Sequence, residues 1–539
     1  MFIICVRIIR ISVLKFRQSY IINDRYFMRF HLLLIIFVSS IYLLILSPNL
    51  VSILLGWDGL GLTSYLLVIY YRSPKAFNSG IITALSNRVG DALILVRIGY
   101  LSMYGNWNLY FYINKSVPLI LAYLIIVAAC TKSAQIPFSA WLPAAMAAPT
   151  PVSSLVHSST LVTAGVYLII RHNNLFFISN VSSYLMIIGI ITIILASISA
   201  LFEIDLKKIV ALSTLRQLGV IILRLGLGAY IARFFHLLSH AFFKALLFIS
   251  TGNIIHNSKD YQDLRQVGGS AKILPVTNRF TLISRIRLIG VPFMSAFFSK
   301  EIILEFLLIK NFNFFIYLIM VVGIFLTASY RTRFVIYVFS RPTHNLILTF
   351  KREEDNFIIK GIVFLLLPAR VTGFWGRLIL WDSIKSRRSL LIIKIIILIL
   401  IRLGVYFFYK KISGRNKTSW NFIFWGLRCI WCLPIITSQV PISFFSDLRR
   451  TVPKFLDRGI LISKMSNLNL LFRERTFLTI SIKLIYKIII LIVIWSFVTI
   501  LYYLCIIIQN NKFKIKTIIK ILNIASSMKS NFLFCIFIM

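Results

Sequence analysis

Several ionisable residues of the chain lie inside long apolar runs, where a charged side chain is costly. They include Asp58 in GWDGLGLTSYLL, Lys132 after AACT, and His157 in SSLVHSSTLV. Residues of this kind usually mark a route for ions or protons. A buried carboxylate with a local structural role is the other interpretation of Asp58, and a satisfied core histidine is the other interpretation of His157. Lys132 has no charged neighbour in sequence, so its partner must come from another helix.

Three titratable residues recur at intervals of four in FHLLSHAFFKALLF, namely His236, His240 and Lys244. This spacing places them on one face of a helix over about two turns. Two histidines at this spacing can bind zinc, but no third ligand is evident. Because a neutral imidazole both accepts and donates a proton near pH 7, a proton path explains this face better than a metal site.

Two further charged pairs are candidate site residues. Arg88 and Asp91 are three residues apart, which is the helical spacing of an ion pair, and a structural role and a functional role both stay open. Lys300 and Glu301 follow Pro292 in GVPFMSAFFSKE. Their alternative interpretation is an anchor at the membrane interface.

The sequence contains no motif for a redox or nucleotide cofactor. It has no Walker A lysine motif, and its glycines in GWDGLG do not follow a strand as a dinucleotide fingerprint would. Its 6 cysteines are dispersed, and the lone Cys429 and Cys432 pair in an apolar run is more typical of a structural role. We therefore expect no cofactor and no metal in this chain.

The composition shows which solvent surrounds these residues. Of the 539 residues, 59% are hydrophobic and 14% are charged, and the mean hydropathy is +0.87. So much apolar surface requires a bilayer. The net charge of +43 would favour nucleic acid binding in a soluble protein, but the basic residues are scattered among apolar runs. The chain is therefore expected to be a multi-pass membrane protein that binds no nucleic acid.

Apolar runs long enough to span a bilayer recur along the chain, and we expect about fourteen transmembrane helices. The absence of strand alternation favours an all-α protein, because lipid requires internally satisfied backbone. Lys132 is followed by PFSAWLPAAMAAPTP, whose four prolines predict a discontinuous helix. Pro292 repeats this arrangement before Lys300. Two such breaks indicate a pair of transport half-units.

At this point a resemblance becomes specific. The segments GWDGLGLTSYLLVIYY, NRVGDALIL, ALSTLRQLG, FHLLSHAFFKALLF, FFSKEIILE and the stretch from Lys132 to Ile169 resemble the mitochondrial NADH dehydrogenase subunit 5 family. These proteins are the distal antiporter-like membrane subunits of respiratory complex I. The match runs from about Phe30 to Val338 and is looser beyond Ser340.

The resemblance implies two inverted five-helix repeats with a proton half-channel in each, then a lateral amphipathic helix and a final anchor. The corresponding divisions are a residual segment 1–29, a first half-channel in 30–180, a second in 181–340, further helices in 341–440, a lateral helix in 441–480, the anchor 481–508 and a basic tail 509–539.

The same resemblance implies roles for individual residues. Asp58 stands where the family has an acid, usually Glu, that pairs with a lysine, and Lys132 resembles that lysine. His157 would continue the route. The group His236, His240 and Lys244 resembles the central hydrophilic axis of the family. Lys300 with Glu301 resembles its terminal lysine site. Arg88 with Asp91 resembles the ion pair near the first site.

The mechanism that follows is electrostatic. A carboxylate near Lys132 keeps the lysine protonated, and weakening that pair releases the proton. The resemblance implies that the energy comes from electron transfer between NADH and ubiquinone in neighbouring subunits. Those subunits would hold NAD, FMN, iron-sulfur clusters and ubiquinone. The expected location is the mitochondrial inner membrane, among other membrane-arm subunits. A subunit of a free-standing cation/proton antiporter is the alternative, and a passive structural anchor is a third interpretation that the polar axis disfavours.

The chain departs from the family in two respects. GWDG comes early, so helices that normally precede it are expected to be missing. The second departure is a set of arginines in apolar runs where the family tends to have small residues: Arg97, Arg216, Arg224, Arg285, Arg287 and Arg331. Some animal mitochondria read AGA and AGG codons as serine. We therefore hypothesise that these positions carry serine and that part of the basic charge is a translation artefact.

Overall fold

The computed structural model describes most of the chain up to residue 413. The described residues are 1–21, 24, 26–103, 119–173, 176, 181–228, 230–258, 260–291, 297, 304, 307, 314–340, 355–383, 391–413 and 446. The chain divides into two compact units, one of Met1–Lys310 with Ile316–Pro441 and one of Asn311–Phe315 with Ile442–Met539. The first unit holds nearly all of the described residues. Cys429, Cys432, nearly all of the expected lateral helix, the anchor and the tail lie outside the described residues.

The described part of the chain is helical, and the all-α prediction is confirmed there. Its one β-bridge joins Asp205 to Asp263. The elements are α1 (Phe2–Tyr20), α2 (Phe27–Leu46), α3 (Leu50–Val68), α4 (Pro74–Ser102), α5 (Leu119–Lys132), α6 (Trp141–Ala144), η1 (Ala145–Ala147), α7 (Thr150–Val152), η2 (Ser153–Thr160), α8 (Leu161–Arg171), α10 (Ser182–Phe202), α11 (Leu206–Leu227), α12 (Tyr230–Asn257), α13 (Ser270–Ile273), α14 (Pro275–Ile289), α16 (Phe314–Val335), η3 (Ile336–Ser340), α17 (Asn356–Ser383) and α18 (Leu391–Ser413).

Seven of the helices among the described residues are long and apolar enough to cross a membrane. They are Phe27–Leu46, Leu50–Val68, Thr150–Arg171, Ser182–Phe202, Leu206–Leu227, Phe234–Asn257 and Ile316–Ser340. The chain is thus a multi-pass membrane protein. Several other expected spans, α5 among them, form helices that are shorter or carry more charge, and the expectation of about fourteen extends into residues outside the described part.

The N-terminal segment is a regular helix, where the sequence suggested only a residual segment. Helix α1 packs against α17 and α12. Its buried face includes Val6, Ile9, Val13 and Phe16, while most of its basic residues lie outside this face and lower its mean hydropathy. An amphipathic pattern of this kind escapes a search for continuous apolar runs.

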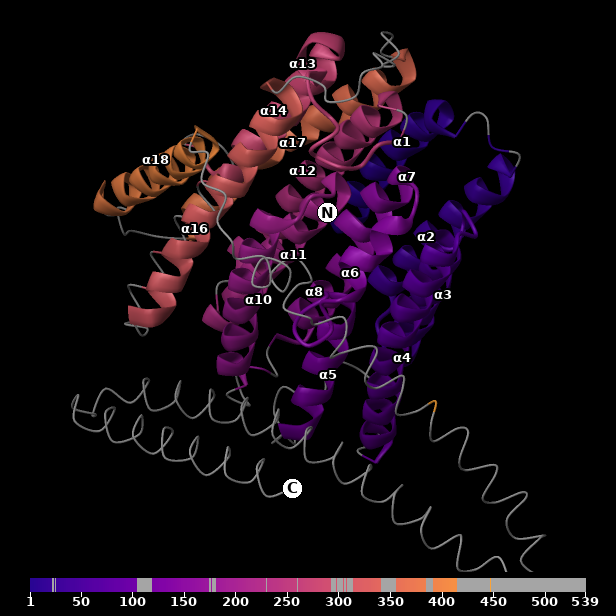
Figure 1. The fold of residues 1–539 in the computed structure, drawn as a ribbon. Helices are drawn as coiled ribbons and strands as arrows, with labels where there is room; N and C mark the ends of the chain where they lie inside the picture. The colour runs from indigo at the N-terminus through magenta and orange to yellow at the C-terminus, as the bar shows by residue number, and fades with distance from the viewer. Residues whose placement is uncertain are drawn as a thin grey trace, which may run out of the picture. The chain divides into compact units, whose positions relative to one another are not determined.

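Consecutive helices pack side by side in the described bundle, with α2 against α3, α3 against α4 and α10 against α11 (Figure 1). Small residues allow the closest approach. A Cβ atom at Gly56 would lie 2.8 Å from the Cα atom of Leu44, so α2 and α3 touch through their backbones. Helix α12 packs against α1, α11, α14, α17 and η2. It adjoins η2, which holds His157, and itself carries the second group of polar residues described below.

The predicted discontinuous helix is present. Helix α5 ends at Lys132, and residues 133–140 are not helical before α6 begins at Trp141. Ser133, Ala134 and Gln135 are buried. Proline removes the amide donors that would continue the helix, and irregular backbone at this depth is tolerated where it is enclosed by protein, as it is at residues 133–135.

Candidate functional site

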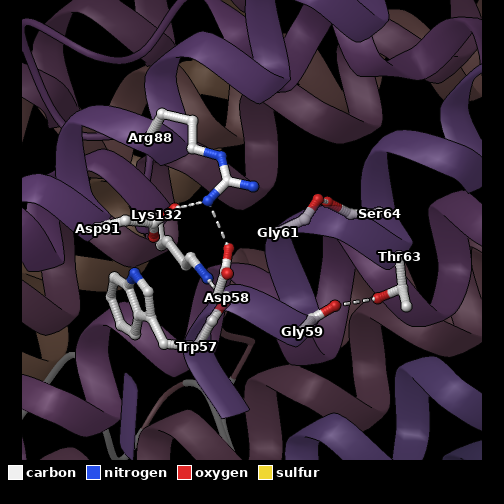
Figure 2. Close-up of polar contacts among 9 residues, drawn as sticks. All are labelled: Trp57, Asp58, Gly59, Gly61, Thr63, Ser64, Arg88, Asp91 and Lys132. Carbon is white, nitrogen blue, oxygen red and sulfur yellow. Dashed lines mark hydrogen bonds and ion pairs between the residues drawn. The ribbon is translucent and has the colours of Figure 1, made fainter. Parts of the chain in front are cut away.

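Helices α3, α4 and α5 bring the first group of polar residues together, as Figure 2 shows. Arg88 Nη1 on α4 donates a hydrogen bond of 2.8 Å to Asp58 Oδ1 on α3. The same nitrogen lies 3.3 Å from Asp91 Oδ2 one turn further along α4. The intrahelical Arg88 and Asp91 pair that the spacing predicted is therefore present. One guanidinium thus binds two carboxylates.

The ion pair of Arg88 and Asp58 is partly exposed on the surface of the isolated chain. The side chains of Arg88 and Asp58 are 52% and 39% exposed on the isolated chain, whereas that of Asp91 is 8% exposed. Both exposed residues lie near the middle of their helices. A charge pair at that depth cannot face lipid without cost, so this surface is suited to contact with another polar protein surface.

Lys132, at the end of α5, is fully buried. Its Nζ donates a hydrogen bond to the backbone carbonyl oxygen of Trp57. The same nitrogen lies 4.2 Å from the centre of the Trp57 ring. Among the described carboxylates, none has an oxygen within 4.0 Å of this nitrogen. The family resemblance implies a pair between Asp58 and Lys132, but in this structure Asp58 pairs with Arg88 and Lys132 with Trp57.

His157 lies in the π-helical turn η2 and is buried among hydroxyl groups. The neighbouring hydroxyls donate to carbonyl groups of the same segment, as Thr160 does to Leu155. The Trp141 ring lies 6.2 Å from the imidazole, edge to face. Trp141 Nε1 in turn donates to the carbonyl oxygen of Thr131 at 2.8 Å, beside Lys132. Neither ring nitrogen of His157 has a hydrogen-bond partner among the described residues, so both nitrogens remain available to bind or release a proton.

The second group of polar residues lies on α12. His236, His240 and Lys244 are buried, and the two imidazole rings are 6.3 Å apart. Lys244 Nζ donates a hydrogen bond of 2.5 Å to Ser213 Oγ on α11. The helix face that the spacing of four predicted is therefore turned into the bundle, against a hydroxyl group of α11. Lys300, Glu301 and Pro292 lie outside the described residues.

The six anomalous arginines are all buried: Arg97, Arg216, Arg224, Arg285, Arg287 and Arg331. Arg216 Nη2 donates to the carbonyl oxygen of Gly323 at 2.9 Å, while its Nε and Nη1 have no hydrogen-bond partner among the described residues. Within that part of the chain, Arg285 Nε and both Nη atoms of Arg331 are also without one. For Arg216, Arg285 and Arg331, a buried cation without a salt bridge to a described carboxylate is unusual, and this is what the serine hypothesis predicts.

Sequence reasoning missed Trp57, Trp141 and Ser213. Each touches a candidate residue that lies on another segment, so no local spacing reveals the contact. The one available signal was that Trp57 directly precedes Asp58, and an indole beside an intramembrane lysine is a candidate for a cation–π contact.

Comparisons with known proteins show which family the chain belongs to. Residues 47–327 match the family "NADH:quinone oxidoreductase/Mrp antiporter, TM". The chain is 43% identical over 448 residues to NADH-ubiquinone oxidoreductase chain 5 of Locusta migratoria, covering 80% of this chain and 78% of that protein. It is 41% identical over 472 residues to chain 5 of Aedes aegypti, covering 85% and 81%. The chain belongs to the NADH-ubiquinone oxidoreductase chain 5 family.

Solved structures share the fold of this chain-5 family member. The Mrp complex from Dietzia sp. aligns with a TM-score of 0.67 at 23% identity, covering 90% of this chain and 55% of that one. The membrane-bound sulfane sulfur reductase, an archaeal respiratory membrane complex, aligns with a TM-score of 0.63 at 18% identity, covering 76% and 83%. The described helices therefore adopt an antiporter-like arrangement.

Proposed function

We propose that this chain is a core membrane subunit of proton-translocating NADH:ubiquinone oxidoreductase and moves protons through its buried Lys, His and acid groups. The observation that carries this proposal is the fully buried Lys132, which ends a broken helix beside the Asp58, Arg88 and Asp91 network. Such a costly arrangement has no use in a passive anchor. Relatives of 40% to 50% identity carry the name NADH-ubiquinone oxidoreductase chain 5.

In the first half-channel, Arg88 and Lys132 compete for one carboxylate. Asp58 now binds Arg88. Movement of Asp58 toward Lys132 would stabilise a proton on the lysine, and its return to Arg88 would favour release of that proton toward His157. Two opposite charges 4 Å apart interact by about 4 kcal/mol at an effective dielectric constant of 20. Moving one charge across 100 mV is worth about 2.3 kcal/mol, so exchange of one ion pair is large enough to drive a proton.

In the second half-channel, the α12 face supplies the path. His236, His240 and Lys244 are spaced one turn apart, and Ser213 accepts the lysine hydrogen bond. Neutral imidazoles can pass a proton from one to the next through water. Lys300 and Glu301 complete this path in the proposal, as the terminal site that the family resemblance implies.

The proposed division of the chain follows the two polar groups. Residues 30–180 form the first half-channel and residues 181–340 the second. Residues 341–440 add helices, 441–480 form a lateral helix, and 481–508 anchor the chain.

The proposed partners are other membrane-arm subunits in the mitochondrial inner membrane. The exposed pair of Asp58 and Arg88 gives the chain a charged surface at membrane depth that such a subunit would cover. Electron transfer takes place in partner subunits that hold NAD, FMN, iron-sulfur clusters and ubiquinone. This chain supplies proton transfer only. A free-standing antiporter is not favoured, because the curated relatives are named as oxidoreductase subunits.

The test is to resolve native mitochondrial membranes on a non-denaturing gel, stain for NADH oxidation and identify peptides of this chain by mass. We expect the peptides in the NADH-oxidising band. Their recovery only from a smaller band without NADH oxidation would overturn the proposal and favour the antiporter.

A further inference from the structure

One residue makes both contacts that the structure records for the Lys132 ammonium group. Trp57 accepts its hydrogen bond through the backbone carbonyl oxygen and presents the indole face at 4.2 Å. Trp57 and Lys132 are both fully buried. Figure 2 shows the indole beside the lysine side chain, while dashed lines join Arg88 to Asp58 and Asp91.

These contacts suit a cation that has lost its carboxylate. A helical carbonyl oxygen has a second lone pair available after its helical hydrogen bond. Tryptophan is the best aromatic partner for an ammonium group, and a desolvated contact of this kind favours the bound cation by about 30-fold, or about 2 kcal/mol. Water cannot compete at a fully buried site.

The position of Trp57 in the chain couples the two contacts to the ion pair. Asp58 is the next residue, so one turn of α3 carries the indole, the accepting carbonyl and the carboxylate. A shift of this turn therefore changes the surroundings of Lys132 and the Asp58 to Arg88 pair together.

We propose that Trp57 is a positioning residue for proton transfer, which holds the charged Lys132 while Asp58 is bound to Arg88. This inference rests on the proposed function. Without the indole, the ammonium group loses its position during that interval, and its proton is no longer directed toward His157.

The test uses the assembled complex with Trp57→Phe and Trp57→Met. Phenylalanine keeps an aromatic face, whereas methionine has none and adapts to irregular gaps. Comparison of the two variants therefore separates the effect of the ring from the effect of packing. Protons moved per NADH oxidised are measured in sealed inner-membrane vesicles, with uncoupled NADH oxidation and assembly measured beside them. Phe37→Leu on α2 is the matched control, because Phe37 is equally buried and belongs to neither polar group.

We expect the proton ratio to fall in the order native, Trp57→Phe, Trp57→Met, with the last approaching Lys132→Met. Uncoupled NADH oxidation should stay within about twofold, and Phe37→Leu should keep the native ratio. Equal ratios for the two Trp57 variants would show a packing role and overturn the inference. If Trp57→Met does not assemble, the proton ratio of Trp57→Phe is the test. A packing role predicts the native ratio for Trp57→Phe, whereas the inference predicts a lower one.

The Lys132→Met variant tests the proposed function separately. A native ratio in Lys132→Met would remove Lys132 from the proton path and overturn the proposed function. A low ratio in Lys132→Met with native ratios in both Trp57 variants would overturn only the inference about Trp57.

Discussion

Three buried arginines around Lys244 lead to a prediction about the chemical identity of the mature chain. Arg216 on α11, Arg285 on α14 and Arg331 on α16 lie close enough for their charges to repel that of Lys244. None of the three forms a salt bridge with a described carboxylate. As written, the sequence would surround Lys244 with cations.

The cost of this arrangement is a large fraction of the stability of a protein. An arginine at the centre of a membrane helix costs about 2.5–3.5 kcal/mol on insertion scales, and Arg216 lies near the middle of the span Leu206–Leu227. Natural proteins are stable by only about 5–15 kcal/mol. Serine at the same positions would bond to a carbonyl of its own helix, as Ser284 does to Thr281 at 2.8 Å, and would line the site with hydroxyl groups.

We therefore expect serine at positions 216, 285 and 331 of the mature protein. Arg17 has the same signature, because it is buried and its Nε and Nη1 have no hydrogen-bond partner among the described residues. The expectation extends to position 17, and to 97, 224 and 287 by the sequence argument.

The assay is peptide mass analysis of the purified complex after digestion with trypsin and, separately, with chymotrypsin. Trypsin cleaves after arginine and not after serine, so peptides should run uncut through positions 216, 285 and 331 and carry the mass of serine. Arg88 is the internal control, since its two carboxylates identify a true arginine that trypsin should recognise. A peptide that ends in Arg216, or the mass of arginine at that position, would refute the reasoning.

Three further predictions concern packing and the two polar groups. Gly56→Ala should push α2 and α3 apart, because its Cβ would meet the Leu44 backbone at 2.8 Å or closer. The cost of about 1–3 kcal/mol should lower the thermal midpoint of the complex. Gly99→Ala, with open space around it, should leave the midpoint unchanged. Ser213→Ala removes the acceptor of the 2.5 Å bond from Lys244, a charged hydrogen bond worth about 1.5–3 kcal/mol; we expect fewer protons per NADH in vesicles, and an unchanged ratio would exclude this bond from the path. Asp91→Asn removes the buried half of the Arg88 pair and should lower the proton ratio while Asp58 keeps its bond to Arg88; a native ratio would assign Asp91 a structural role only.

The sequence by itself determined the features that depend on local order along the chain. Apolar runs with few strand signals predicted membrane helices, because the bilayer satisfies no backbone hydrogen bonds. Four prolines after Lys132 predicted a helix break, and the structure ends α5 at that lysine. The spacing of His236, His240 and Lys244 predicted one helix face, since the α-helical repeat alone decides which side chains lie one above the other.

Only the tertiary structure decided which groups meet across helices. Asp58 has Arg88 and Lys132 as candidate partners, and packing of α3 against α4 selects Arg88, 30 residues away. Lys132 takes its contacts from Trp57, 75 residues away, and Lys244 from Ser213, 31 residues away. Ion pairs and cation–π contacts act over a few ångströms, so their choice depends on helix positions within the bundle, which no spacing along one segment contains. Burial of the anomalous arginines likewise follows from the neighbours that surround each helix.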